Sequence, residues 1–215
     1  MKRIFSLDSP FICFMENVAD FFILNLLTVL CSIPLVTVGA ALTAHYKVMQ
    51  DKLLDWDQPI LKAYFRAFAE NFLQATAFWL MTAAVIALFV VDVFVIHVYF
   101  DEGWAHMTYM LLAVLGFVAF GIACYAFPLI ARYENTMKEH FRNSFILALG
   151  NLPRTLLLVL LAAVPVLVAI VSIELFLNTV IIWFVFGISV ILFLQTLVLK
   201  PIILRLEQKD TDDDQ

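Results

Sequence analysis

The sequence predicts an all-α, polytopic membrane protein, and both its composition and the length of its apolar runs support that fold class. Of the 215 residues, 64% are hydrophobic and 14% are charged. Ordinary soluble domains are roughly 45–50% apolar and about 25% charged, so lipid is the expected solvent. Five apolar runs each reach the length of about 20 residues that a helix needs to cross a bilayer. We expect one helical membrane domain over residues 1–209 and a disordered acidic tail over residues 210–215.

The charge and the cysteines exclude several classes of function. The net charge is −5, but residues 210–214 hold four of the 18 acids, and the other 14 nearly balance the 13 bases. This balance does not indicate a nucleic-acid partner. Cys13, Cys31 and Cys124 are scattered through apolar surroundings and show no spacing typical of a disulfide framework or a metal site. We therefore expect no cofactor and no metal.

The chain divides into an amphipathic start and five spans. Residues 1–20 mix aromatic and charged side chains, and we expect a short interfacial helix that begins near Ser9-Pro10, because proline suits a first helical turn. The five predicted spans are Phe21–Ala44, Ala75–Val98, Thr108–Ala131, Thr155–Ile173 and Asn178–Leu199.

The first of these spans contains an expected break. Pro34 lies near its middle, removes one backbone donor and clashes with the preceding turn, so the helix must kink or end there. In lipid, the freed backbone groups need other partners, and Ser32 and Thr37 are close enough in sequence to supply them. With Gly39 nearby, this break is the feature around which we expect the other spans to pack.

The segments between the spans predict the topology. Residues 45–74 and 132–154 each hold four Lys or Arg residues, whereas residues 99–107 and 174–177 hold none. Basic loops concentrate in the cytoplasm, so five full spans predict a cytoplasmic C-terminus and an external N-terminus. Lys2 and Arg3 oppose that orientation. The alternative is a re-entrant hairpin broken at Pro34, which would place both ends inside.

Both basic segments are also expected to contain amphipathic helices. Apolar and aromatic residues recur with helical period over Pro59–Gln74 and over Asn135–Leu149. Such helices can lie on the inner leaflet, or they can dock onto a cytoplasmic or membrane partner. The candidate partner-contact residues are Phe65, Phe68, Phe141 and Phe145.

Several stretches together carry a family resemblance. They are Leu24-Asn25-Leu26-Leu27, the run from Ser32-Ile33-Pro34-Leu35 to Gly39-Ala40-Ala41, Phe65–Phe68 with Asn71-Phe72, Phe127-Pro128-Leu129-Ile130-Ala131-Arg132-Tyr133, and Asn151-Leu152-Pro153-Arg154-Thr155. In this order they resemble the YesL-type bacterial integral membrane proteins over most of the chain. Ala40 departs from the family pattern, which often has proline at that place.

The resemblance implies a location and a biological setting, without implying a reaction. It implies a multi-pass protein of the bacterial plasma membrane whose family genes often lie beside carbohydrate-uptake transporters and glycan-degrading enzymes. No catalytic or ligand-binding residue is established for the family, so the resemblance assigns none here.

A few polar residues and prolines within the spans are candidates for a structural or functional role. Asn25 and Ser32 share one helical face, where hydrogen bonds between helices explain such residues without a substrate. Asp92 lies toward the outer end of the second predicted span, and Pro128 and Arg132 lie where the third one ends. The full set is Asn25, Ser32, Pro34, Thr37, Gly39, Asp92, Pro128 and Arg132.

The sequence favours a supporting function over catalysis. We find no nucleophile elbow, phosphate loop, metalloprotease motif or carboxylate pair, so we expect that the protein is not an enzyme. Our first hypothesis is an accessory or assembly factor for a transport system, such as carbohydrate uptake, or for a cell-envelope system. Its expected partners are the lipid bilayer and either transporter subunits or other membrane proteins. The alternative is a small membrane transporter or channel. A purely structural membrane protein is the third class.

Overall fold

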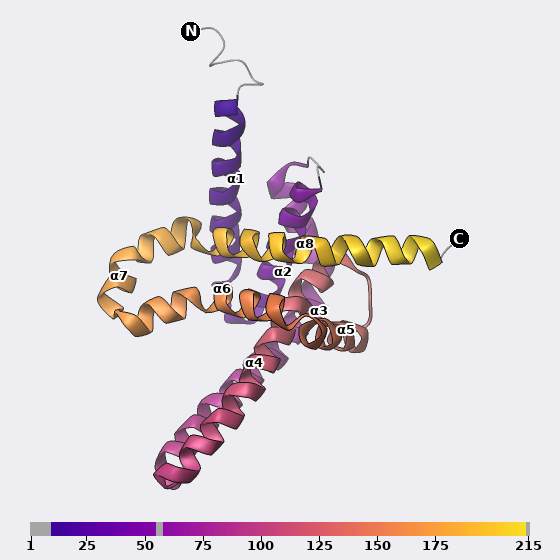
Figure 1. Ribbon diagram of the computed structural model, residues 1–215. Helices are drawn as coiled ribbons and strands as arrows, with labels where there is room; N and C mark the ends of the chain where they lie inside the picture. The colour runs from indigo at the N-terminus through magenta and orange to yellow at the C-terminus, as the bar shows by residue number, and fades with distance from the viewer. Residues whose placement is uncertain (1–9, 55–57, 214–215) are drawn as a thin grey trace.

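The computed structural model describes residues 10–54 and 58–213, and every regular element in those residues is a helix (Figure 1). This confirms the all-α fold class. In chain order the elements are α1 (Pro10–Cys31), the 3-10 turn η1 (Leu35–Thr37), α2 (Val38–Leu53), α3 (Ile60–Tyr99), α4 (Glu102–Arg132), α5 (Met137–Gly150), α6 (Leu152–Val171), α7 (Ile173–Ile182), the π-helical turn η2 (Trp183–Gly187) and α8 (Ile188–Asp213).

Four helical stretches in the described part of the chain are long and apolar enough to cross a membrane, so the protein is a polytopic helical membrane protein. They are α3, α4, α6 and the continuous run Ile173–Glu207, which contains α7, η2 and most of α8. Four of the five predicted spans lie within these helices, apart from the last two residues of Thr155–Ile173, which fall in the turn into α7 and at its start.

The fifth predicted span, Phe21–Ala44, is a correction, because the structure divides it between two helices. α1 ends at Cys31, and α2 begins at Val38 and folds back along α1. Two contacts fix the antiparallel register: Thr28 bonds to His45, and the Asp20 carboxylate pairs with Lys52. The prediction of one continuous helix over Phe21–Ala44 is therefore wrong, and the described residues form a helical hairpin broken at Pro34, the shape that the re-entrant alternative requires.

The turn of this hairpin satisfies its own backbone. Pro34 has no N–H and ends the helical ladder, as expected. The Thr37 hydroxyl bonds to the carbonyls of Cys31 and Pro34 at 2.5 and 2.7 Å, and the Trp79 indole N–H donates to the Leu35 carbonyl at 2.7 Å. The predicted role of Thr37 is thus confirmed. The Ser32 side chain makes no hydrogen bond within the described residues.

Gly39 permits the close packing of this hairpin on α3. A Cβ added at Gly39 would lie 2.3 Å from the Ala75 carbonyl oxygen and 2.5 Å from the Trp79 Cβ. Any side chain would push α2 away from α3. The small residue therefore determines how the hairpin is seated on the first long helix.

α3 and α4 form a long antiparallel pair, drawn at the lower left of Figure 1. The 40 residues of α3 rise about 60 Å, roughly twice the thickness of a bilayer core. The amphipathic segment predicted over Pro59–Gln74 is the first part of this helix and continues directly into the span. The second predicted amphipathic helix is confirmed as α5, which begins with a capping box in which the Glu139 backbone N–H donates to the Thr136 hydroxyl and the Thr136 backbone N–H donates to the Glu139 carboxylate.

The last two crossings form a second hairpin. The Ser172 hydroxyl accepts the Leu175 N–H at 3.1 Å at the start of α7, and α8 returns along α6 (Figure 1). The disordered tail was predicted to begin at Asp210, but α8 continues through Asp213 and so includes the first four residues of that tail. Residues 214–215 lie outside the described residues. Residues 1–9 of the predicted interfacial helix also lie outside them, while residues 10–20 belong to α1.

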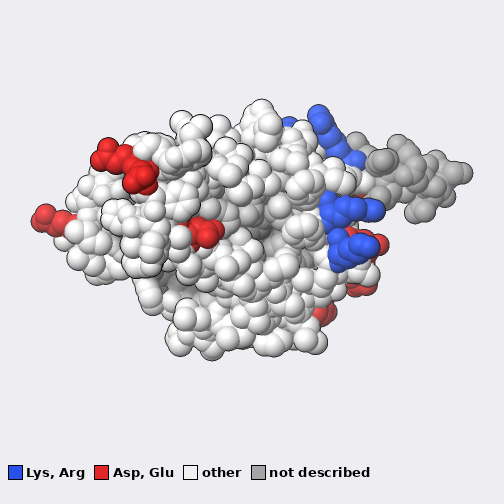
Figure 2. All heavy atoms as spheres, turned by 90° about the horizontal axis from the view of Figure 1, so that it is seen from below, with Lys and Arg blue, Asp and Glu red and all other residues white. Residues whose placement is uncertain are grey.

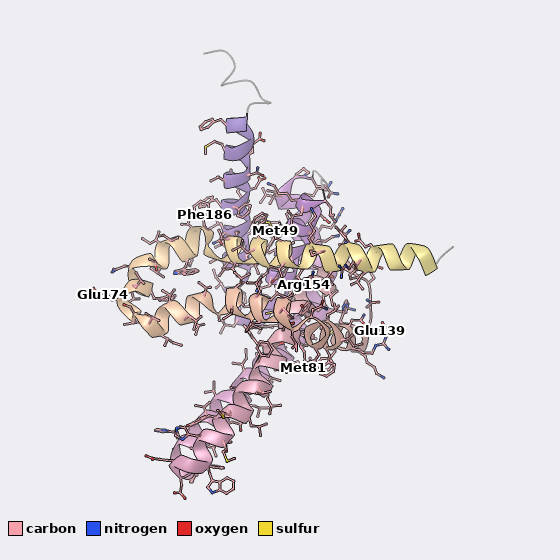
Figure 3. The ribbon with its side chains drawn as sticks, in the orientation of Figure 1. Met49, Met81, Glu139, Arg154, Glu174 and Phe186 are labelled. Atoms are coloured by element: carbon pink, nitrogen blue, oxygen red, sulfur yellow. The ribbon has the colours of Figure 1, made fainter. Side chains whose placement is uncertain are left out.

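Charged side chains divide the molecule into two ends. On the face in Figure 2, the visible lysines and arginines lie toward one end, and the opposite end carries acidic side chains alone. Figure 3 shows Glu174 at the tip of the second hairpin and Arg154 at the open end of the same hairpin, where α6 begins. We call the end that carries Lys47, Arg132, Lys138, Arg142 and Arg154 the basic end, and the end that carries Asp101, Glu102 and Glu174 the acidic end.

Candidate functional site

The best-defined polar site is the contact between Asn25 of α1 and the π-helical turn of the second hairpin. The Asn25 amide donates to the Phe184 carbonyl at 2.5 Å, and its carbonyl oxygen accepts the Ser189 backbone N–H at 2.9 Å. A π turn would join this carbonyl and this N–H directly, because they are five residues apart. Asn25 instead stands between them, and the Ser189 hydroxyl returns a bond of 2.8 Å to the Phe21 carbonyl.

A second buried contact lies one turn further along α1. The Thr28 hydroxyl donates to the Leu24 carbonyl at 2.8 Å and lies 2.8 Å from His45 Nδ1. Because that hydroxyl has a single proton, Nδ1 must be the donor to Thr28, which leaves the lone pair of the neutral ring on Nε2. His45 is fully buried, and Nε2 has no hydrogen-bond partner among the described residues.

Two glutamines connect the hairpin to the other spans. The Tyr46 hydroxyl of α2 donates to the Gln195 carbonyl oxygen of α8, and the Gln195 amide donates to the Leu158 carbonyl of α6 at 3.0 Å. Gln50 donates to the Pro128 carbonyl inside α4 at 3.1 Å. These amides join four helices through bonds that low dielectric strengthens.

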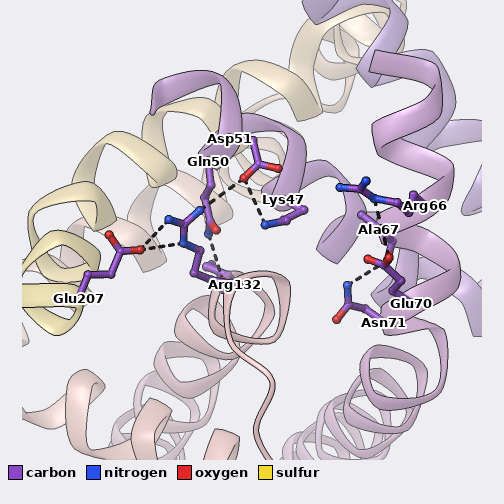
Figure 4. Close-up of polar contacts among 10 residues, drawn as sticks. Lys47, Gln50, Asp51, Arg66, Ala67, Glu70, Asn71, Arg132 and Glu207 are labelled. Carbon is purple, nitrogen blue, oxygen red and sulfur yellow. Dashed lines mark hydrogen bonds and ion pairs between the residues drawn. The ribbon is translucent and has the colours of Figure 1, made fainter. Parts of the chain in front are cut away.

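Charged residues at the basic end form a compact cluster (Figure 4). Arg132 of α4 reaches Glu207 of α8 through Nε at 2.9 Å and Nη2 at 2.6 Å, and its Nη1 lies 3.4 Å from Asp51 of α2. Lys47 lies 3.2 Å from the same Asp51 oxygen. The side chains of Arg132 and Asp51 are each 12% exposed, so this cluster is screened far less than the surface pair Arg66–Glu70.

Several of the predicted site residues make contacts that hold the fold together, and others do not. Asn25, Pro128 and Arg132 all join helices, while Gly39 and Thr37 shape the hairpin. Asp92 is exposed on the acidic half of α3, and none of the ion pairs found in the described part of the chain includes it.

The candidate partner-contact residues fall into two groups, those exposed at the surface and one that packs within the fold. Phe65, Phe141 and Phe145 are 51%, 45% and 41% exposed, so they remain available for a contact. Phe68 instead packs between Tyr64 and Phe72, with ring centroids 6.4 and 5.6 Å away. Its role is within the fold, because the helical face that the period identified is partly covered by α2.

Sequence reasoning missed the polar residues that hold the hairpin in place. Tyr46, His45, Ser189 and Gln195 each bond across helices, and the separations along the chain reach 168 residues. The sequence shows that these polar residues lie inside apolar runs, but it does not show which residues they contact. In the described ranges we find no group of three or more His, Cys, Asp or Glu side chains that could hold a metal ion.

α5 is attached to the bundle through a buried polar face. His140 and Ser144 are fully buried one turn apart, and neither side chain has a hydrogen-bond partner within the described residues. Burial lowers the pKa of His140, and the neighbouring Glu139 carboxylate opposes this only in part. The ring is therefore neutral near pH 7.

One of the comparisons with known proteins matches the first part of the chain to a family of unknown function. A family model described as "Protein of unknown function, DUF624" matches residues 21–93, which cover the first hairpin except for the start of α1, and most of α3. YesL-type proteins are in that family, so the match supports the first part of the resemblance. The stretches at residues 127–133 and 151–155 lie outside the matched range. No curated protein and no solved structure matches the chain.

Proposed function

We propose that this protein is an accessory or assembly factor of a bacterial transport or cell-envelope system, with carbohydrate uptake as the favoured setting, and that it neither catalyses a reaction nor carries a substrate alone. The bacterial plasma membrane as its location follows the family resemblance. The observation that carries the proposal is the aromatic surface of α5 and the start of α3 at the basic end.

This surface is held firmly, which favours a docking role over a loose membrane anchor. The capping box at Thr136 fixes the start of α5, and Ala148, His140 and Ser144 are buried against the bundle. Phe145 and Ile146 then point outward with 41% and 57% exposure. Exposed aromatic side chains on a rigid helix are typical of helix-in-groove and interface contacts.

The hydrogen bonds inside the helix bundle favour a protein that does not carry a polar substrate through itself. Asn25 and Gln195 use both ends of their amides in bonds between helices. A polar substrate that crossed here would have to break these bonds in a low-dielectric setting, where unsatisfied groups are costly. The charges of Arg132 and Asp51 are likewise occupied at the basic end.

The hairpin also changes the proposed topology. The Asp20–Lys52 pair brings the first half of α1 to the loop that precedes α3. With four crossings after the hairpin, the start of α1 and the end of α8 lie on one side. We place the basic end in the cytoplasm, following the distribution of Lys and Arg, which agrees with Lys2 and Arg3.

A crosslinking experiment tests the proposal. A photoreactive residue at Phe145 or Phe65 in native membranes should capture one defined membrane protein, and the same probe at the exposed Leu88 should label lipid alone. Phe145→Ser should leave insertion intact, abolish the crosslinked complex and reduce uptake of the partner's substrate, while Leu88→Ser should do neither. Purified protein that moves a sugar or an ion across liposomes unaided would overturn the proposal and favour the transporter alternative.

A further inference from the structure

An apolar cavity of about 530 Å³ lies between α3 and α4, in the part of both helices that crosses the membrane. One wall follows α3 from Phe78 to Val93, and the other contains Gly116 and Ala119 of α4. Both are small, and a Cβ at Gly116 would only reach ordinary contact with the Phe89 ring, at 3.4 Å. We call this cavity the α3–α4 groove.

The length and the chemistry of the groove suit an extended hydrocarbon chain. The α3 wall from Phe78 to Val93 rises about 22 Å, and apolar side chains line it along this length. An occupant that contacts the whole wall must therefore be long and apolar, as an unbranched chain of CH₂ groups is.

The lining is suited to an apolar occupant. It consists of aromatic and aliphatic side chains together with Thr82, whose hydroxyl donates to the Phe78 carbonyl of its own helix at 2.9 Å. That bond occupies the one hydroxyl proton on the wall. A sugar or an ion would lose its hydration here without replacement, whereas a hydrocarbon chain gains by burial.

Phe141 of α5 lines the groove, and the cations Lys138 and Arg142 lie on either side of it in the sequence. Lys138 and Arg142 are exposed one helical turn apart, and no ion pair within 4 Å engages either of them in the described residues. Glu139, the neighbouring acid, is held by the Thr136 backbone N–H at 2.8 Å and by its hydroxyl at 2.9 Å. Figure 3 shows Glu139 on α5 and Met81 on the groove wall.

From the shape and the charge together, we propose that the α3–α4 groove binds one acyl chain of an anionic phospholipid whose phosphate lies against Lys138 and Arg142. A chain that starts at the headgroup level beside α5 runs past Phe141 and along Phe89 toward Val93. The bases contribute electrostatic attraction at the membrane surface, and the groove buries the chain between the two helices. Phe141 borders both this site and the proposed docking surface, but Phe145 and Phe65, which probe the docking surface, do not line the groove.

Native mass spectrometry tests retention of the lipid. The full chain is purified in mild detergent from membranes that contain phosphatidylglycerol and phosphatidylethanolamine. The wild type should keep one phosphatidylglycerol. Ala119→Leu should lower its retention about tenfold or more, since it displaces several buried CH₂ groups. The exposed Ala113→Leu on the same helix is the matched control and should retain the lipid. The double variant Lys138→Gln, Arg142→Gln should keep a lipid but lose the preference for phosphatidylglycerol, and Lys62→Gln should keep that preference.

A second measurement on the wild-type protein does not depend on how the variants fold. Phosphatidylglycerol with a photoreactive group near the end of one chain should label peptides that contain Phe89 or Val93 in preference to the lipid-facing Val114. Equal labelling of these peptides would overturn the proposal. Wild-type protein that retains no more lipid than Ala119→Leu would also overturn it, as would a crosslinked protein helix in the groove.

Discussion

The side chain of Asn25 stands between the Phe184 carbonyl and the Ser189 backbone N–H, so a residue of the first helix completes the hydrogen bonding of the last one. A π turn is a costly interruption in lipid because water is not there to solvate its carbonyls and N–H groups. Here the interruption is what connects the first hairpin to the second. The wide turn at Trp183–Gly187 and the polar residue on α1 are two parts of one contact.

Replacing Asn25 should therefore destabilise the bundle strongly. Asn25→Ala leaves one donor and one acceptor unsatisfied in a buried site, which costs about 1–3 kcal/mol for each group. The loss is measured as a lower unfolding midpoint in SDS titration of the purified protein. Asn71→Ala is the control, since Asn71 bonds only within its own helix, to the Ala67 carbonyl at 3.0 Å. Equal midpoints for Asn25→Ala and the wild type would contradict the contact.

The close contact between the first hairpin and α3 should not tolerate a side chain at position 39. Gly39→Ala places a Cβ 2.3 Å from the Ala75 carbonyl oxygen, so α2 must shift, at a cost of about 1–3 kcal/mol. Gly103→Ala meets nothing within 4 Å on α4 and should be neutral or slightly stabilising. Thermal unfolding in detergent compares the two. Similar destabilisation by both substitutions would show that the space around Gly39 is not decisive.

The charge cluster at the basic end should contribute more than a surface ion pair. Arg132→Gln removes the charge that Glu207 and Asp51 share; the Asp51 side chain is 12% exposed and that of Glu207 is 35% exposed. We expect a loss of about 1 kcal/mol or more in unfolding free energy, since Asp51 and Arg132 have little access to water, although Asp51 keeps its contact with Lys47. Arg66→Gln, which breaks an exposed pair of 3.8 Å, should cost less than about 0.5 kcal/mol. If high salt removed the Arg132 effect entirely, the cluster would behave as a surface feature.

The hairpin predicts that α1 begins on the same side of the membrane as α5. In a chain whose three cysteines are replaced by serine, Glu16→Cys and Lys138→Cys should both react with an impermeant thiol reagent only from the cytoplasm. Gly103→Cys should react from the outside. A full crossing by Phe21–Ala44 would instead expose Glu16→Cys on the outer side. Labelling of inverted and right-side-out vesicles distinguishes these outcomes.

The attachment of α5 should weaken in acid. The pKa of His140 is lowered in the folded state, so the unfolded state binds a proton more readily. The stabilising contribution of the neutral ring is present above the ordinary histidine value of about 6.5 and is lost as the pH falls below it. The protection factors of the α5 amides, which correct for slower intrinsic exchange in acid, should therefore fall between about pH 7 and pH 5. His140→Gln should remove that fall, whereas replacement of the exposed His106 should not.

Much of the fold was accessible from the sequence because a bilayer constrains single segments. Length and apolarity alone identify α3, α4, α6 and the α7–α8 run as helices that can cross, since backbone groups in lipid must be satisfied within the segment. Helical period predicted α5, and Pro34 and Thr37 marked the break in the first run. The two charged ends follow from where the lysines and arginines fall along the chain.

Tertiary structure alone decided the course of the first run and the partners of its polar residues. A hairpin and a single crossing have the same composition over Phe21–Ala44, and the difference lies in contacts such as Thr28 with His45 and Gly39 against Ala75. Asn25 meets Ser189 across 164 residues, a distance at which helical periodicity carries no information. The α3–α4 groove likewise is lined by residues of two helices, among them Phe89 and Gly116, and only the packing of those helices brings them together.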